Sequence, residues 1–149
     1  MIFGYSNKGH DGYIGNTVIG EWCNLGADTN TSNLKNNYSI VKVHNFALNR
    51  SESTGSQFCG LTMGDHSKSG INTMFNTGTM CGVFANVFGS DFPHRNIPSF
   101  GWGGAAGFKS FRLADALDVA QKMMERRKID LTDDWKAVYT HLHTELAPK

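Results

Sequence analysis

The sequence predicts an all-β fold of the solenoid type, in which short strands and tight corners repeat along the chain. The first observation is a six-residue period over residues 63–89, and the second is that residues 2–30 follow the same rule. No helix or ordinary strand has a period of six, whereas a solenoid unit made of one flat side and one turn does. The alternative is a glycine-rich β domain in which the phasing is accidental.

Three places in each unit carry the pattern. The first place is mostly apolar, the second is glycine or asparagine, and the fifth is small. The first places are Met63, Phe75, Cys81 and Val87. The second places are Gly64, Gly70, Asn76 and Gly82, and the fifth places are Ser67, Thr73, Thr79 and Ala85. We expect left-handed or strained backbone at the second place, because glycine and asparagine tolerate it. Lys8 and Ser69 are polar residues at first places and weaken the pattern.

If three units form one coil, residues about eighteen apart stack on each other. This spacing predicts that Met63 stacks with Cys81, that Ser69 stacks with Val87, and that Ile2 lies near Ile19. Residues 1–90 would form the solenoid, with a long inserted loop at 31–62 that contains a short strand over 39–44. Residues 91–110 form an aromatic connector rich in proline and glycine, without solenoid phase.

Residues 111–149 predict two amphipathic helices. The apolar face of the first has Leu113, Ala116, Leu117, Ala120 and Met123 or Met124, and that of the second has Trp135, Val138, Tyr139, Leu142 and Leu146. Thr132 is the expected N-cap of the second helix. Because the end of a solenoid exposes unpaired strands, we expect the helices to form a C-terminal cap there. A membrane-surface role is the alternative, although acidic and basic residues are mixed on both helices.

Composition narrows the function classes. A formal net charge of +1 gives no electrostatic reason to expect nucleic acid or an anionic membrane as a partner. No apolar run is long enough for a spanning helix, and no signal peptide is visible, so the expected location is cytoplasmic. Of the three cysteines, Cys23 and Cys81 fall at places expected to be in the core.

The runs at residues 9–16 and 19–33 carry a family resemblance. They resemble the C-terminal acetyltransferase domain of the bifunctional N-acetylglucosamine-1-phosphate uridylyltransferase/glucosamine-1-phosphate acetyltransferase family, and more closely that of related sugar nucleotidyltransferases. The match covers residues 2–34 in register and residues 63–89 by repeat pattern. The resemblance implies a left-handed parallel β-helix of hexapeptide repeats, acetyl-CoA as co-substrate, a sugar phosphate as substrate, and a homotrimer.

The resemblance also implies a set of site residues. His10 matches the catalytic base that takes a proton from the sugar amine, and Tyr13 and Asn24 match residues that hold the sugar phosphate. Ala27 and Asn33 match positions near the acetyl group and its oxyanion, and Gly89 matches a small residue beside coenzyme A. From the residues alone, the favoured interpretation of His10 is a corner histidine that bonds to its own loop, and the resemblance reverses this preference.

Several positions depart from the family. Leu34 stands where the family has tyrosine, and Ile71 replaces a small residue on the coenzyme side. The family's basic phosphate ligands precede the position of Met1, and no glycine-rich nucleotide loop is present, so the chain resembles a fragment of a longer transferase. Two functions follow as expectations. One is an acetyltransferase module acting on an amino-sugar 1-phosphate, and the other is a non-catalytic trimerisation scaffold for a nucleotidyltransferase domain.

Further expectations concern aromatic residues and histidines. Trp22 and Phe84 would be exposed anchors of the trimer interface. His66 would point outward at a corner, as a surface or interface residue, and a second catalytic base is the alternative. His44, His94, His141 and His143 lack the spacing of a metal site, so no metal is predicted.

Overall fold

The computed structural model describes all 149 residues, and most of its strands are very short and pair in parallel. The first sheet contains β1 (Val18–Ile19), β6 (Thr62–Met63), β9 (Met80–Cys81) and β11 (Asn96–Ile97). The second contains β2 (Asn24–Leu25), β7 (Lys68–Ser69), β10 (Asn86–Val87), β12 (Gly101–Gly104) and β13 (Gly107–Ser110), and the third contains β3 (Asn30–Thr31) and β8 (Met74–Phe75). From β1 to β3 and again from β6 to β8, the chain passes through the first, second and third sheets in turn.

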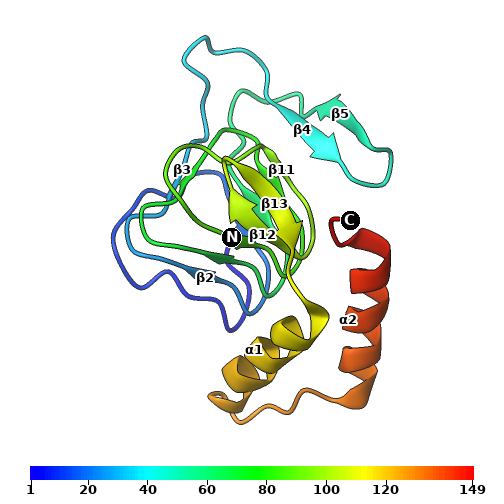
Figure 1. Ribbon diagram of the computed structural model, residues 1–149. Coiled ribbons are helices and arrows are strands. Elements are labelled where there is room, and N and C mark those ends of the chain that lie inside the picture. Colours follow the sequence, from blue (N-terminus) through cyan, green and yellow to red (C-terminus); the bar gives the residue numbers. More distant parts are fainter.

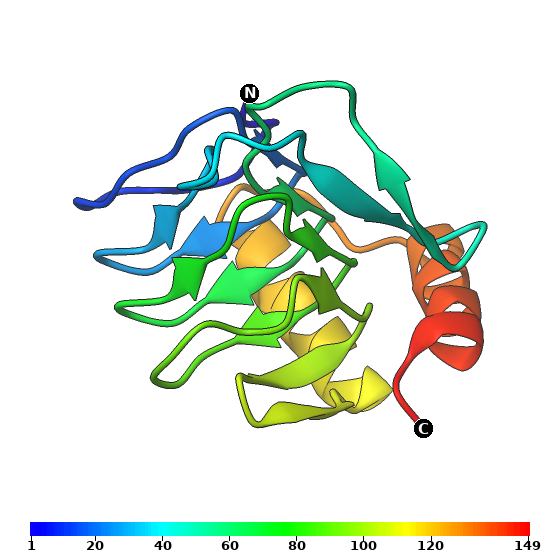
Figure 2. The ribbon, with the colours of Figure 1, turned by 90° about the horizontal axis from the view of Figure 1, so that it is seen from above.

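The register confirms the predicted stacking. Met63 pairs with Cys81, Ser69 pairs with Val87, and Ile2 forms a parallel bridge to Ile19. Further bridges add residues 7 and 14 to the second and third sheets. Figure 2 shows the resulting layers in chain order, from blue at the N-terminus to yellow-green. The arrangement is compatible with a parallel β-helix.

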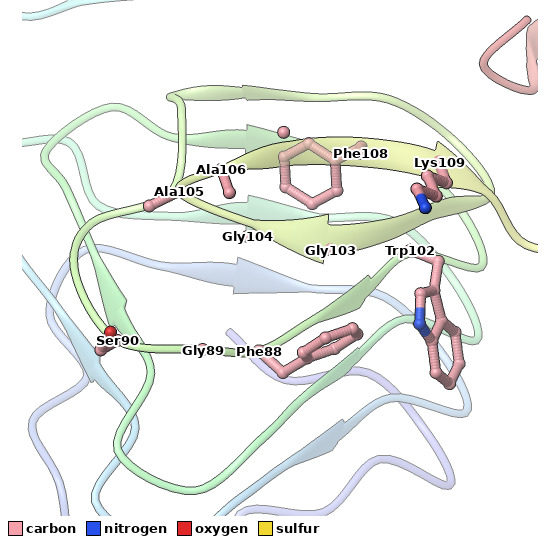
Figure 3. Close-up of a pocket in the computed structure, with 11 residues that line it drawn as sticks. Phe88, Gly89, Ser90, Trp102, Gly103, Gly104, Ala105, Ala106, Phe108 and Lys109 are labelled. Atoms are coloured by element: carbon pink, nitrogen blue, oxygen red, sulfur yellow. The ribbon is translucent and has the colours of Figure 1, made fainter.

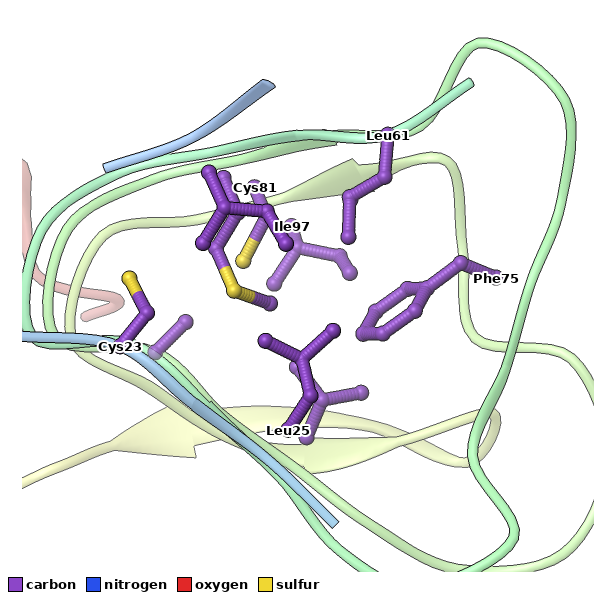
Figure 4. Packing of buried hydrophobic residues seen from close by; sticks show 10 residues of the cluster. Cys23, Leu25, Leu61, Phe75, Cys81 and Ile97 are labelled. Atoms are coloured by element: carbon purple, nitrogen blue, oxygen red, sulfur yellow. The ribbon is translucent and has the colours of Figure 1, made fainter. Parts of the chain in front are cut away.

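The core lies inside the three sheets. Ten buried residues form it, and they come mostly from the first places of the six-residue units (Figure 4). They are Ile19, Cys23, Leu25, Leu61, Met63, Phe75, Cys81, Ala85, Val87 and Ile97. Cys23 and Cys81 are buried, as predicted, and both are free thiols. Burial raises the pKa of Cys23 to about 11 and that of Cys81 to about 12, so both thiols stay protonated.

The second place of each unit does not have the left-handed backbone that we expected there. Left-handed φ angles occur at the fourth place instead, for example 59° at Trp22, 60° at His66 and 56° at Phe84. The second-place glycines are needed for close approach between layers. A Cβ atom on Gly82 would lie 2.3 Å from Ser99 Oγ and 2.5 Å from Ser99 N in the next layer, which no side chain could tolerate.

The inserted segment forms a hairpin. Within residues 31–62, β4 (Lys42–Asn45) and β5 (Arg50–Ser53) pair antiparallel, so the predicted strand over 39–44 lies three residues later than expected at its start. In Figure 1 this hairpin projects beyond the layered strands. The insertion therefore leaves the stack and returns to it at β6.

The stack continues through residues that we had interpreted as a connector. β11 pairs with β9, and β12 pairs with β10, so the segment 96–104 adds another layer. Ile97 is fully buried at a first place, and Phe100 has a φ of 55° at the fourth. The six-residue pattern did not predict this unit, because Pro98 stands at its second place instead of glycine. The antiparallel strand β13 then pairs with β12 at the edge of the second sheet.

The helices α1 (Leu113–Glu125) and α2 (Asp133–Leu146) lie along the side of the stack, not over its end as we predicted. They pack against a row of fourth-place side chains at the corner between the first and second sheets, of which all but Tyr5 are buried. We call these residues the aromatic ladder: Tyr5, Trp22, His66, Phe84 and Phe100. Successive ring centroids along the ladder are 4.1, 6.1, 4.5 and 5.0 Å apart.

Three expectations about this corner were wrong. Trp22 and Phe84 are buried beneath the helices and cannot be exposed interface anchors. His66 is 1% exposed and lies between Trp22 and Phe84, with its Nε2 atom 3.1 Å from the Tyr139 hydroxyl. The repeat could not reveal this, because the helices that bury the corner come from a distant part of the chain.

The helix faces were predicted with mixed success. Ala116, Ala120 and Met124 of α1 are buried, and the Thr132 hydroxyl caps α2 by accepting a hydrogen bond from Trp135 N at 3.4 Å. In α2, however, only Tyr139 is buried, while Trp135 is 51% exposed. Neither helix has the length and apolar composition needed to cross a bilayer.

Candidate functional site

Three of the predicted site residues follow register-matched residues of the second sheet by the same number of positions. In the second sheet, Asn7, Asn24, Lys68 and Asn86 occupy equivalent positions in successive layers. The residues three places later are His10, Ala27, Ile71 and Gly89, and they fall at the corner between the second and third sheets. We call these four residues the corner column. Backbone hydrogen bonds join the layers at this corner, since Asn72 N donates to Ala27 O and Asp28 N donates to Asp11 O, the residue after His10.

His10 begins the column and is exposed. Its imidazole makes no hydrogen bond to the protein, whereas its carbonyl oxygen accepts a bond of 2.7 Å from Lys8 Nζ. The same ammonium group also donates to Asp11 O. The loop is thus fixed through its backbone, and the imidazole nitrogens are available to a ligand.

Gly89 lies at the other end of the column, beside a hollow of about 720 Å³. Figure 3 shows Phe88 and Trp102 below the Gly103–Gly104 strand, with Phe108 and Lys109 on the strand that follows. Gly89 has a φ of 108° and open space where a Cβ atom would be, so backbone conformation rather than internal packing requires glycine here. The hollow is large enough for part of a coenzyme-sized ligand.

Ile71 lies between Ala27 and Gly89 in the column and is 70% exposed. A ligand that extends along the corner from Gly89 towards His10 would have to pass this side chain. The replacement of the family's small residue by Ile71 therefore falls within the corner column.

The other predicted residues lie elsewhere. Tyr13 is 56% exposed next to the third sheet, and its backbone N–H donates to Asn30 Oδ1 at 2.7 Å. Asn33 comes after the third sheet, whereas the corner column comes before it, and Asn33 Nδ2 donates to Asn16 Oδ1 at 2.7 Å. Within one chain, His10 and Asn33 are therefore at opposite ends of the third sheet.

Asn24 lies on the outer side of the second sheet, three residues before Ala27 of the corner column. Its Oδ1 accepts a bond of 3.2 Å from Asn7 Nδ2, and it borders hollows that are also lined by Lys68, Lys122 and Arg126. Sequence reasoning missed these basic residues. The only sequence signal was the cluster of positive charges at the end of the first predicted helix. No group of three His, Cys, Asp or Glu side chains comes together as a metal site.

Comparison with curated proteins shows that the chain is similar to bifunctional sugar nucleotidyltransferase/acetyltransferase proteins. The chain is 38% identical over 90 residues to the bifunctional protein GlmU of Methanocaldococcus jannaschii. It is 31% identical over 88 residues to the bifunctional sugar-1-phosphate nucleotidylyltransferase/acetyltransferase of Sulfurisphaera tokodaii.

These alignments cover 60% and 59% of this chain, and the matched region is 21% of the length of each relative. No protein-family profile matches the chain.

Proposed function

We propose that the chain is a left-handed hexapeptide β-helix that acts as an acetyltransferase module. The reaction would transfer an acetyl group from acetyl-CoA to the amine of an amino-sugar 1-phosphate, in a cytoplasmic enzyme of nucleotide-sugar synthesis. The observation that supports the proposal is the register of Asn7, Asn24, Lys68 and Asn86, because His10, Ala27, Ile71 and Gly89 each follow one of them by three residues. The similarity to two bifunctional nucleotidyltransferase/acetyltransferase proteins supports it.

Each residue has a defined part in this proposal. The free imidazole of His10 accepts a proton from the amine as its nitrogen attacks the thioester carbonyl, which forms the amide and releases the thiol of coenzyme A. Ala27 is small and leaves room beside His10 for the acetyl group. Coenzyme A lies along the column towards Gly89 and the hollow beside Trp102. Tyr13 and Asn24 bind the sugar phosphate.

The proposed site needs more than one copy of the chain. The side-chain amide of Asn33 is the proposed donor to the acetyl oxygen, yet it lies at the far end of the third sheet from His10. A neighbouring copy that packs against this sheet brings its Asn33 towards the first copy's His10. We therefore propose a homotrimer, in which each site forms between two copies.

A trimerisation scaffold without catalysis is the second candidate. Ile71 favours it, because this exposed side chain occupies the path proposed for the coenzyme. Leu34, which replaces a family tyrosine next to Asn33, adds to this argument.

The experiment is to measure coenzyme A release from acetyl-CoA in the presence of glucosamine 1-phosphate. We expect His10→Ala to lower the turnover by roughly 10²–10⁴-fold, which is the usual contribution of a positioned general base. His94→Ala is the matched control, since His94 is exposed and lies outside the corner column. Undiminished turnover in His10→Ala would remove this residue from the mechanism, and absence of turnover in the parent protein would favour the scaffold.

A further inference from the structure

A groove between the end of α1 and the outer side of the second sheet collects basic side chains. It consists of two adjoining hollows of about 390 and 370 Å³, which share Asn24, Met123 and Arg126. Four basic residues line the groove: Lys68, Lys122, Arg126 and Arg127. Residues that are distant in the sequence thus place their positive charges in one concave region.

Most of this charge has no carboxylate partner in the protein. Lys122 pairs with Asp118 at 2.6 Å, but Lys68, Arg126 and Arg127 form no salt bridge. No aspartate or glutamate lines either hollow. The groove therefore keeps a net positive charge that an anion could neutralise.

Lys68 is the most informative member because it comes from the sheet and is half-buried. Its ammonium donates to His66 O at 2.9 Å, and burial lowers its pKa to about 8. A partly desolvated cation without a carboxylate costs free energy unless an anion binds nearby. The dipole of α1 explains why Lys122 and Arg126 are favourable at the end of the helix, but it does not explain Lys68.

Neutral groups complete the groove. Asn24 Oδ1 is engaged by Asn7, so the Nδ2 group of Asn24 has no protein acceptor and can donate to a ligand. Tyr5 stacks on Trp22 with ring centroids 4.1 Å apart and is 46% exposed, so one aromatic side chain remains accessible at the edge of the groove. These features suit a ligand with an anionic group next to a ring.

We propose that this groove binds a phosphate ester, with Lys68 and Arg126 as its main ligands and Asn24 Nδ2 as a hydrogen-bond donor. Arginine and lysine together are a common phosphate-binding pair, because charge-assisted hydrogen bonds to phosphate are strong. Phosphate binding in the groove does not depend on the proposed function. The identity of the ligand does, since the phosphate belongs either to the amino-sugar phosphate or to coenzyme A.

Calorimetric titration with inorganic phosphate and with glucosamine 1-phosphate, at low ionic strength, tests the groove directly. We expect saturable binding that weakens about tenfold or more in Arg126→Gln and in Lys68→Gln, because each change removes a charge-assisted hydrogen bond. Arg95→Gln is the matched control, since it removes the same charge from an exposed position outside the groove. Melting curves show whether each variant is folded.

Absence of phosphate binding to the folded parent protein, or equal binding in Arg126→Gln and Arg95→Gln, would overturn the proposal. The titration does not depend on turnover, so an inactive module leaves this result interpretable. Where acetyl transfer is measurable, a higher KM for the sugar phosphate in Arg126→Gln identifies the substrate as the source of the phosphate. A higher KM for acetyl-CoA identifies the coenzyme instead.

Discussion

His66 occupies the fourth place of its six-residue unit, where the backbone is left-handed and the side chain joins the aromatic ladder. Its ring is 4.5 Å from that of Phe84 and bonds to the Tyr139 hydroxyl, while its Nδ1 atom has no partner. Burial, with a smaller contribution from the charge of Lys68, lowers the pKa of His66 from 6.5 to about 3. The folded protein therefore holds this imidazole neutral at every pH above that value.

This shift predicts a loss of stability in mild acid. Between pH 6.5 and pH 3 the unfolded chain binds a proton at His66 that the folded protein does not, so the free energy of unfolding falls as the pH falls. His66→Phe removes this dependence, and phenylalanine is compatible with the backbone because Phe84 and Phe100 adopt the same φ. Between pH 6.5 and 4.5, we expect the wild type to lose about 2 kcal/mol more than the variant.

Urea unfolding at several pH values measures this difference. His94→Gln is the control, because His94 is exposed and should leave the pH dependence unchanged. Equal slopes for the wild type and His66→Phe would show that His66 does not remain neutral in the folded state.

At the scale of elements, α1 is held against the stack by small residues. Ala116 and Ala120 are fully buried, which allows the helix axis to come close to the aromatic ladder, and Leu117 at the edge of this contact is only half-buried. Ala120 is therefore the most sensitive position at which to test whether the helix is attached.

Replacing Ala120 with aspartate places an unpaired charge in this contact. We expect a loss of several kcal/mol, about 3 kcal/mol by analogy with other buried unpaired charges, and a lower melting temperature by roughly 10 °C. Ala114→Asp is the matched control, because Ala114 is on the exposed side of the same helix. If both variants melted at the wild-type temperature, α1 would not be packed against the ladder in solution.

At the scale of the whole molecule, the proposed trimer requires a face that α1, α2 and the inserted hairpin leave open. The corner that holds the aromatic ladder cannot form the trimer interface, because the helices cover Trp22 and Phe84. The third sheet is open to a partner, with Met74 at 36% exposure in β8 and Tyr13 at 56% beside it. This is also the sheet that separates His10 from Asn33.

Light scattering of the purified protein should give the mass of three chains. We expect Met74→Asp to yield monomers with an unchanged circular dichroism spectrum, because the charge would be buried without a partner in the interface. Leu48→Asp in the exposed hairpin should remain trimeric. A wild-type monomer at micromolar concentration would exclude the proposed trimer, and a trimeric Met74→Asp would place the interface elsewhere.

The sequence by itself determined the repeat and its consequences. Apolar first places and small fifth places predicted the stacking of Met63 with Cys81 and the burial of Cys23 and Cys81, because a six-residue period leaves few ways to form a core. It also predicted His10 as the proposed base, through the resemblance, and the N-cap at Thr132.

Only the tertiary structure decided how the remaining segments use this stack. Ile97 and Phe100 extend it although Pro98 interrupts the glycine rule, because the existing layer supplies hydrogen-bonding partners for the next. His66 is buried rather than exposed, because α2 contributes Tyr139 from 73 residues further along the chain. The basic groove likewise requires Lys68 and Arg126 to meet across a sheet and a helix, and local sequence patterns cannot predict such long-range contacts.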